Sequence, residues 1–254
     1  MFVAVANSKG GVGKSTIAVH AAVWLRERGV RLAVVDADAQ ASTSEWLAQA
    51  APGLRIERCE TVAQLNERLP RLSAVYDVVL ADGPAALSAE TVVLAAAADL
   101  VLLPIGPSMM DVRASYRTAR MLYNLRLRVH RTERPQVVTI LNRVQPRTRL
   151  AQIAMEAVGK YGFPLARTCL CLRQAYAEAC GKGTVVWKLG DSGRRAAIEI
   201  RRLFDDVLTV VPRTLPASAV VMPNTPVNPL APTSPAPTPP ATPVTPVAAA
   251  RPGE

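Results

Sequence analysis

Short apolar runs alternate with longer stretches of helical spacing along most of the chain. The apolar runs are predicted strands because they are short and rich in Val, Ala, Leu and Ile, and the stretches between them are predicted helices. The predicted strands cover residues 2–6, 31–35, 77–81, 100–104 and 136–141. Runs that are apolar on both faces are typical of a parallel sheet with helices on both sides. The pattern therefore predicts an α/β fold that binds ligands at the carboxyl ends of its strands.

The composition changes after the last predicted helix, 194–210, in which Ile198, Leu203, Phe204 and Val207 are expected to face the core. Thirteen of the 21 prolines lie beyond residue 211, in a segment without helical or alternating periodicity. Such a segment cannot bury enough apolar surface to offset its chain entropy. We therefore expect one folded domain, 1–211, and a disordered tail rich in Pro, Ala and Thr, 212–254.

The loop after the first predicted strand has the composition of a phosphate-binding loop. A glycine-rich turn before a helix presents successive backbone N–H groups to phosphate oxygens. Lys14 adds a positive charge, and the Ser15 hydroxyl can ligate Mg²⁺. The predicted nucleotide-binding residues are Lys9, Gly10, Gly11, Val12, Gly13, Lys14, Ser15 and Thr16.

Acidic residues end the second and third predicted strands. Asp36 and Asp38 are two positions apart after the second strand, so both carboxylates can point toward a site where Mg²⁺ and an attacking water need oxygen partners. Asp82 ends the third strand and is followed by Gly83 and Pro84. These acids are expected at the same edge of the sheet as the phosphate loop.

Positive charge is concentrated in the middle of the sequence. The net charge is +10 overall, −3 over residues 1–112 and +9 over residues 113–149. A basic region of this kind indicates a polyanionic partner. The alternative is a solvated surface in an arginine-rich protein, since Arg outnumbers Lys by 25 to five.

The cysteines and the N-terminus exclude several classes. Four cysteines lack the paired C-x-x-C spacing of a zinc or iron–sulfur site, and Cys169 and Cys171 are either a soft-metal pair or alternating positions on a buried strand. No basic flank precedes the first apolar run, and no apolar stretch is long enough to span a bilayer. We expect a cytoplasmic protein.

The three motifs resemble, in order, the deviant Walker A loop, switch I and Walker B/switch II of the ParA/MinD family of ATPases, and most resemble small ParA-type partition ATPases. Ser8 stands where an ordinary phosphate loop has its first Gly, and Lys9 is the additional lysine of the deviant loop. Ala39 replaces the family's usual proline. The resemblance covers about residues 1–208.

The resemblance implies an ATPase that uses ATP and Mg²⁺ and dimerises over two ATP molecules. Lys9 would reach the nucleotide of the other subunit, and Asp38 would orient the hydrolytic water. Lys9, Lys14 and Asp38 are thus the expected catalytic residues. The expected metal site comprises Ser15, Asp36, Asp38 and Asp82, and Asn142 would read the adenine edge.

In that family the ATP-bound dimer binds DNA without sequence preference through its C-terminal region, and an adaptor protein of the ParB kind stimulates hydrolysis. The protein would then be nucleoid-associated and would position a plasmid, a chromosome region or a protein assembly. The DNA-binding candidates are Arg173, Lys182, Lys188, Arg194, Arg195, Arg201 and Arg202, with Arg147 and Arg149 next.

Three alternatives share the loop. A MinD-like membrane ATPase should end in a basic amphipathic helix, whereas this chain ends in prolines. An iron–sulfur carrier should have cysteines that bridge a dimer, and none is positioned for this. An ATP-dependent amidoligase or synthetase of cofactor biosynthesis is the strongest enzyme alternative.

Overall fold

A computed structural model describes residues 1–128 and 135–208. The chain divides into two units, Met1–Met222 and Pro223–Glu254. The tail predicted from residue 212 lies outside the described residues. Six strands and eight α-helices are present in the described part, together with two short 3₁₀ helices, η1 (Val186–Lys188) and η2 (Gly190–Gly193).

The strands are β1 (Phe2–Val5), β2 (Leu32–Asp36), β3 (Arg55–Arg58), β4 (Val78–Asp82), β5 (Leu100–Ile105) and β6 (Gln136–Leu141). The helices are α1 (Lys14–Arg26), α2 (Ser42–Ala50), α3 (Val62–Val75), α4 (Ala89–Ala97), α5 (Met109–Arg128), α6 (Arg149–Gly159), α7 (Gln174–Gly181) and α8 (Arg194–Leu208).

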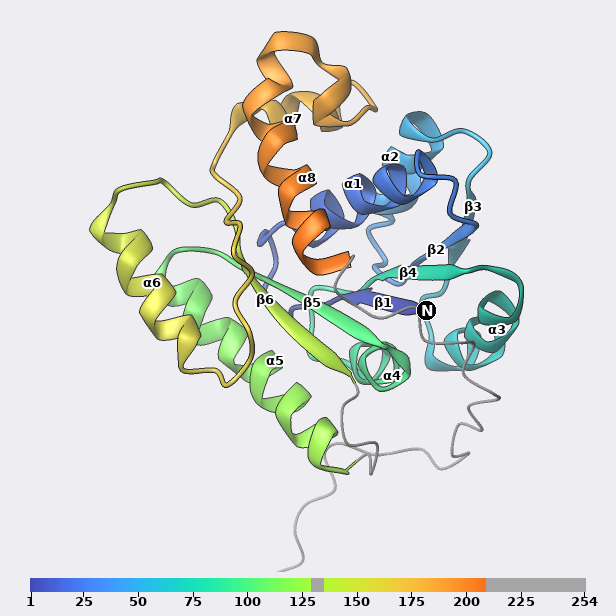
Figure 1. The fold of residues 1–254 in the computed structure, drawn as a ribbon. Coiled ribbons are helices and arrows are strands. Elements are labelled where there is room, and N and C mark those ends of the chain that lie inside the picture. The colour runs from blue at the N-terminus through green and yellow to red at the C-terminus, as the bar shows by residue number, and fades with distance from the viewer. Residues whose placement is uncertain (129–134, 209–254) are drawn as a thin grey trace, which may run out of the picture. The chain divides into compact units, whose positions relative to one another are not determined.

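All six strands are parallel, in the order β3-β2-β4-β1-β5-β6, which confirms the predicted α/β fold (Figure 1). The register pairs Val5 of β1 with Asp82 of β4, and Asp82 with Asp36 of β2. The strand that leads into the phosphate loop therefore ends level with the two acidic strand ends. This alignment assembles one site from three separate motifs.

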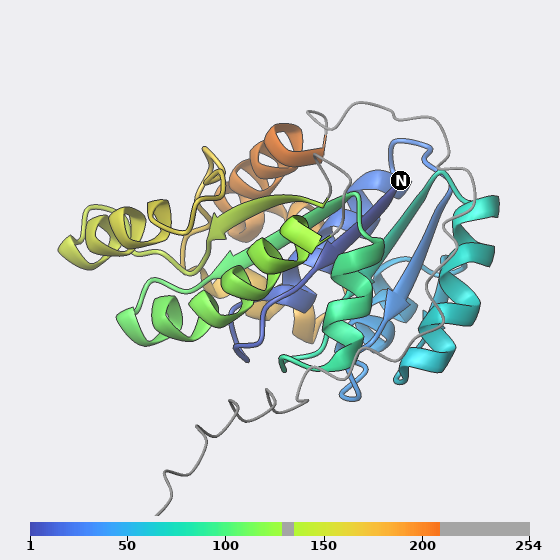
Figure 2. The same cartoon turned by 90° about the horizontal axis from the view of Figure 1, so that it is seen from below.

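The two faces of the sheet are covered by different helices (Figures 1 and 2). Successive strand residues point to opposite faces, so Val3 and Val5 pack with α1, α2, α7 and α8, whereas Phe2 and Ala4 pack with α3, α4, α5 and α6. Because both faces are buried, the central strands are apolar at nearly every position. This explains the continuous apolar runs in the sequence.

Three details differ from the predictions. β3 was not predicted, because it is an edge strand with charged residues at both ends and little burial. Ile198 is 46% exposed, so its predicted place in the core is wrong, and Ala197 and Ile200 are buried instead. Cys169 and Cys171 lie in a loop that forms isolated bridges beside β6, not on a buried strand.

Candidate nucleotide-binding site

Two glycines shape the phosphate loop between β1 and α1. Gly11 and Gly13 have φ angles of 74° and 94°, in the left-handed region that residues with a Cβ atom rarely adopt. Gly13 directly precedes Lys14, the first residue of α1, so the loop lies at a helix N-terminus. Such an N-terminus with its glycine-rich loop can bind phosphate oxygens through backbone N–H groups.

The two lysines of the loop have different surroundings. Lys14 is buried, and burial lowers the pKa of its ammonium group, while Asp82 and Asp38 oppose this shift. Lys9 is half-buried, and its backbone N–H donates to Asn7 Oδ1 at 2.9 Å. In the part of the chain that the structure describes, the Lys9 ammonium group makes no hydrogen bond or ion pair. Lys14 is thus enclosed beside the loop, whereas the Lys9 ammonium group is available to another group.

Asp82 is fully buried beside the loop. Its Oδ2 accepts a hydrogen bond from the Thr43 hydroxyl at 2.7 Å, and its Oδ1 has no partner among the described residues. Burial raises the pKa of Asp82 to about 6, although Ser15, Thr43 and Lys14 act in the opposite direction. An unpaired buried carboxylate oxygen is costly unless a cation compensates it. Asp82 and Ser15 therefore fit a Mg²⁺ ion.

Few protein ligands are available for that ion. Within residues 1–128 and 135–208, no group of three or more His, Cys, Asp or Glu side chains could hold a metal. Mg²⁺ usually keeps several waters and binds one or two carboxylates together with phosphate oxygens. The site fits this mode, in which the nucleotide and water complete the coordination.

Asp36 is the last residue of β2, and Asp38 lies in the turn between β2 and α2. Asp36 is buried, and its Oδ2 accepts hydrogen bonds from the Ser44 N–H and hydroxyl, both at 2.7 Å. Its Oδ1 accepts from the Asp38 N–H at 3.2 Å, while Asp38 Oδ1 accepts from the Gln40 N–H at 3.0 Å. Asp36 therefore fixes the turn, and the half-buried Asp38 is the more accessible carboxylate.

Asn142 and Arg143 support the loop from the end of β6. Asn142 Nδ2 donates to the Val12 carbonyl at 2.7 Å, and Arg143 Nη1 donates to the Gly11 carbonyl at 2.8 Å. A Cβ atom on Gly13 would lie 2.1 Å from Asn142 Nδ2. The structure thus places Asn142 against the loop backbone, and its contact with adenine stays a prediction.

The motifs give no sign of the side chains that hold the start of the loop. Asn7 Nδ2 donates to Ser115 Oγ at 2.7 Å, and the Ser8 N–H donates to Thr118 Oγ1 at 3.0 Å. Ser115 and Thr118 lie on the buried side of α5. Polar residues after a buried strand could have drawn attention to Asn7 and Ser8, but their partners are more than 100 positions away.

The predicted DNA-binding residues fall into two groups. Arg201 lies over a ring, with its guanidinium carbon 5.1 Å from the centre of Trp187. Arg194, Arg195 and Arg202 are exposed on α8, and among the described residues none of them makes an ion pair. The others are paired with acids: Arg173 with Glu199, Lys182 with Glu178, and Lys188 with Glu27.

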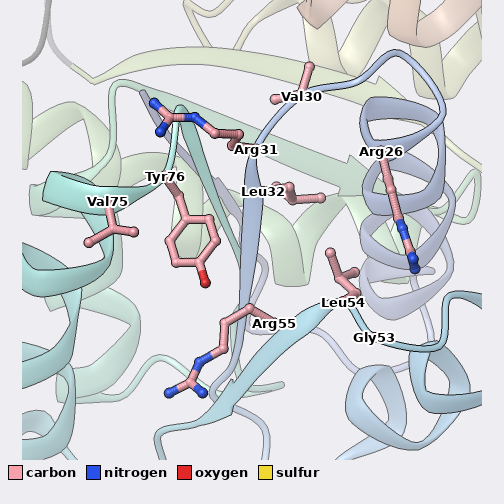
Figure 3. A pocket seen from close by; sticks show the side chains of 9 residues that line it. All are labelled: Arg26, Val30, Arg31, Leu32, Gly53, Leu54, Arg55, Val75 and Tyr76. Carbon is pink, nitrogen blue, oxygen red and sulfur yellow. The ribbon is translucent and has the colours of Figure 1, made fainter.

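A pocket of about 330 Å³ lies at the opposite end of the sheet, where β2 and β3 begin (Figure 3). Arg26, Arg31, Arg55 and Tyr76 contribute to its lining. It contains none of the predicted site residues. The phosphate loop and the acids lie instead at the carboxyl ends of the strands, as predicted.

No helix in the described part of the chain is long and apolar enough to cross a membrane.

The parallel sheet, the glycine-rich loop before α1 and the buried Asp82 together define a P-loop nucleotide-binding protein. Residues 3–186 match the CobQ/CobB/MinD/ParA nucleotide binding domain, so the chain belongs to that family. The ParA and MinD members of the family are P-loop ATPases. The family match confirms the resemblance seen in the motifs.

Curated relatives include proteins that distribute cellular cargo. The chain is 32% identical over 214 residues to the Maintenance of carboxysome distribution protein A of Halothiobacillus neapolitanus, covering 81% of this chain and 95% of the relative. It is 26% identical over 249 residues to the Protein IncC of Escherichia coli, and the match covers 80% of this chain and 68% of IncC. The chain is thus a ParA-like ATPase related to partition and cargo-distribution proteins.

Solved structures share the fold. A McdA–ATP complex from Cyanothece, an Asp-to-Ala variant, has a TM-score of 0.63 at 17% identity and covers 81% of this chain and 95% of its own. MinD of Pyrococcus horikoshii in complex with Mg-ADP has a TM-score of 0.62 at 19% identity and covers 83% and 97%. Both likenesses show that this chain shares their fold.

Proposed function

We propose that the protein is a Mg²⁺-dependent ATPase that dimerises when it binds ATP, binds DNA without sequence preference in that state, and positions a cargo. The observation that carries this proposal is the division between the two loop lysines. Lys14 is buried beside Asp82, whereas the Lys9 ammonium group has no partner among the described residues. A second lysine at a phosphate loop is useful if it contacts the nucleotide of another subunit.

Hydrolysis would depend on residues that already have defined positions. Ser15 and Asp82 would hold Mg²⁺, which neutralises phosphate charge when bound. Asp36 keeps the turn in place through Ser44, so that Asp38 can orient a water toward the γ-phosphate. Asp36 then supports the metal site through the turn and the water shell around the ion.

Contact with DNA is proposed for α8. Exposed arginines without acidic partners can neutralise phosphates, and this requires no base-reading element. Arg194, Arg195 and Arg202 meet this condition, and Arg201 adds a fourth exposed cation on the same helix. Arg173, Lys182 and Lys188 are secondary candidates, because each would first have to leave an acidic partner.

The cargo is proposed to be a protein assembly of the carboxysome kind. The chain covers 95% of the carboxysome distribution protein of H. neapolitanus but only 68% of IncC. An adaptor protein on the cargo would stimulate hydrolysis, as ParB-like proteins do for partition ATPases. The dimer would then leave DNA, and the cytoplasmic protein would be concentrated at the nucleoid in its ATP state.

The test is DNA binding as a function of nucleotide and salt. With a linear duplex of arbitrary sequence, we expect binding with ATP and Mg²⁺, and little binding with ADP. Affinity should fall steeply with salt, and each lost phosphate contact should reduce the log–log slope by about 0.9. The variant R194A/R195A/R202A should show this reduction, whereas R55A, which removes an arginine at the opposite end of the sheet, should not. Equal binding with ADP, or a flat salt dependence, would refute the proposal.

A second candidate is an ATP-dependent amidoligase or synthetase. The family includes CobQ and CobB, and a cobyrinic acid a,c-diamide synthase from Mycobacterium smegmatis has a TM-score of 0.56 to this chain. ATP turnover that requires a small carboxylic acid and is unaffected by DNA would favour this candidate.

A MinD-like membrane role would require binding to vesicles, which a flotation assay measures.

A further inference from the structure

The outer side of α5 carries an exposed surface that the nucleotide site does not use. Its inner side is buried against the sheet through Val112, Ala119 and Leu122. Along the outer side lie exposed arginines and exposed apolar or aromatic residues. This α5 surface comprises Arg113, Tyr116, Arg117, Arg120, Tyr123 and Leu127.

The α5 surface is a single stripe with two flanks. At 3.6 residues per turn, its six side chains fall within an arc of about 120°. Tyr116, Tyr123 and Leu127 form one flank, and the three arginines form the other. The stripe is about 21 Å long, from the 1.5 Å rise per residue. These dimensions match one side of a helix of about four turns.

The two flanks are unusually open. Tyr116, Tyr123 and Leu127 are 51%, 52% and 66% exposed. None of the three arginines forms an ion pair within residues 1–128 and 135–208. α5 lies between α4 and α6 in its layer (Figures 1 and 2). Tyr116 makes an edge-on ring contact with Tyr161, just after α6, and still remains half exposed.

We propose that the α5 surface docks an acidic amphipathic helix of a partner protein. Tyr and Arg are enriched at protein–protein interfaces, and the stripe has no Lys, Glu or Asp. The arginine flank requires carboxylates, and the other flank requires apolar side chains. A DNA backbone would satisfy only the arginines, and a second copy of the stripe would bring three more arginines without any acid.

The same helix connects this surface to the phosphate loop. Ser115 and Thr118, on the buried side of α5, hold Asn7 and Ser8 directly before Lys9. A partner that shifts α5 would therefore act on the position of Lys9. In this way the inference deepens the proposed function, since the adaptor would be such a partner.

The test uses a synthetic 18-residue peptide with Glu along one side and Leu along the other at helical spacing, and a scrambled peptide of the same composition. Fluorescence anisotropy measures binding to the full chain without DNA or ATP, so failure here leaves the proposed function standing. We expect the amphipathic peptide to bind at least tenfold more tightly than the scrambled one. R113E/R117E/R120E should abolish peptide binding. Y123S/L127S should remove the preference for the amphipathic peptide over the scrambled one.

The matched control is R194E/R195E/R202E on α8, which changes the charge equally and should leave peptide binding intact. Circular dichroism melting confirms that each variant is folded. Equal binding of both peptides, or equal loss with the α8 variant, would overturn the proposal. If R113E/R117E/R120E lost DNA binding but kept peptide binding, the α5 surface would be a nucleic-acid surface and the proposal would be wrong. If this variant lost self-association in the absence of peptide, the α5 surface would be an interface between copies of the chain.

Discussion

At the scale of single residues, the site depends on close contacts that the sequence motifs do not show. The motif around Gly13 indicates phosphate binding, but the structure adds that Asn142 Nδ2 occupies the space of a Cβ atom there. Likewise, the motif predicts Asp36 near the metal, and the structure adds that its carboxylate accepts two hydrogen bonds from Ser44. Contacts between residues 8 to 130 positions apart depend on the fold, so local motifs cannot predict them.

The substitution Gly13→Ala is expected to abolish tight nucleotide binding. It adds the strain of a positive φ, about 1–2 kcal/mol, and a Cβ atom that displaces Asn142 from the Val12 carbonyl. Gly29→Ala is the matched control, because Gly29 has a φ of 74° and no atom within 4 Å of its Cβ position. Titration with a fluorescent ATP analogue measures both. Equal affinity in the two variants would contradict this account of the loop.

The buried His20 is expected to make stability depend on pH. Its Nδ1 lies 2.7 Å from the Thr16 carbonyl and its Nε2 accepts from the Val186 N–H, so the ring is neutral with its proton on Nδ1. Burial lowers the pKa of His20 to about 4. Its stabilising contribution is complete above the ordinary pKa near 6.5 and is lost as pH falls toward 4, by up to about 3 kcal/mol.

Asp82 titrates in the same range with the opposite sign, because its pKa is raised to about 6. The measurement is therefore the difference in free energy of unfolding between the native chain and His20→Gln, by urea denaturation from pH 7 to pH 4. The native chain should lose more stability than the variant over this range. Parallel curves would show that His20 does not titrate as described.

At the scale of elements, the central strands could be predicted because burial on both faces makes them continuous apolar runs. β3 could not be predicted, because an edge strand needs little burial. Its sequence, Arg-Ile-Glu-Arg, is therefore mostly charged and has no apolar run. The amphipathic α8 was predicted, but the exposed Ile198 was placed in its core face. The predicted core residues Leu203, Phe204 and Val207 are buried, and Ala197 and Ile200 take the place of Ile198 on the core face.

Helix α2 joins the site to the C-terminal helices, and this link can be measured. Thr43 and Ser44 of α2 hold Asp82 and Asp36, while Trp46 Nε1 donates to the Thr184 carbonyl at 2.8 Å. Hydrogen bonds of α2 therefore connect the acidic turn to the segment before η1.

Trp46→Phe should lower the free energy of unfolding by about 1–3 kcal/mol, because it removes the partner of the carbonyl of the half-buried Thr184. Trp187→Phe is the control, since its Nε1 bonds to the exposed Glu27 at 3.2 Å and should cost less than about 1 kcal/mol from that bond. Urea denaturation compares the two variants. A smaller loss for Trp46→Phe than for Trp187→Phe would contradict the link.

At the scale of the whole molecule, the account requires two chains to join through their nucleotide sites. Lys14 is buried beside Asp82 at the phosphate loop, so Lys14→Ala should abolish nucleotide binding. In the proposed dimer the Lys9 ammonium group contacts only the nucleotide of the other subunit, so Lys9→Ala should bind nucleotide as a monomer and fail to dimerise. Each substitution removes one positive charge from the same loop. They differ only in whether the nucleotide of the same subunit or that of the other subunit loses its contact with a lysine.

Sedimentation velocity with a non-hydrolysable ATP analogue and Mg²⁺ tests this claim most directly. The native chain should be a dimer with the analogue and a monomer with ADP, and Lys9→Ala should be a monomer under both conditions. A native chain that stays monomeric with the analogue, or a Lys9→Ala variant that dimerises as well as the native chain, would contradict it.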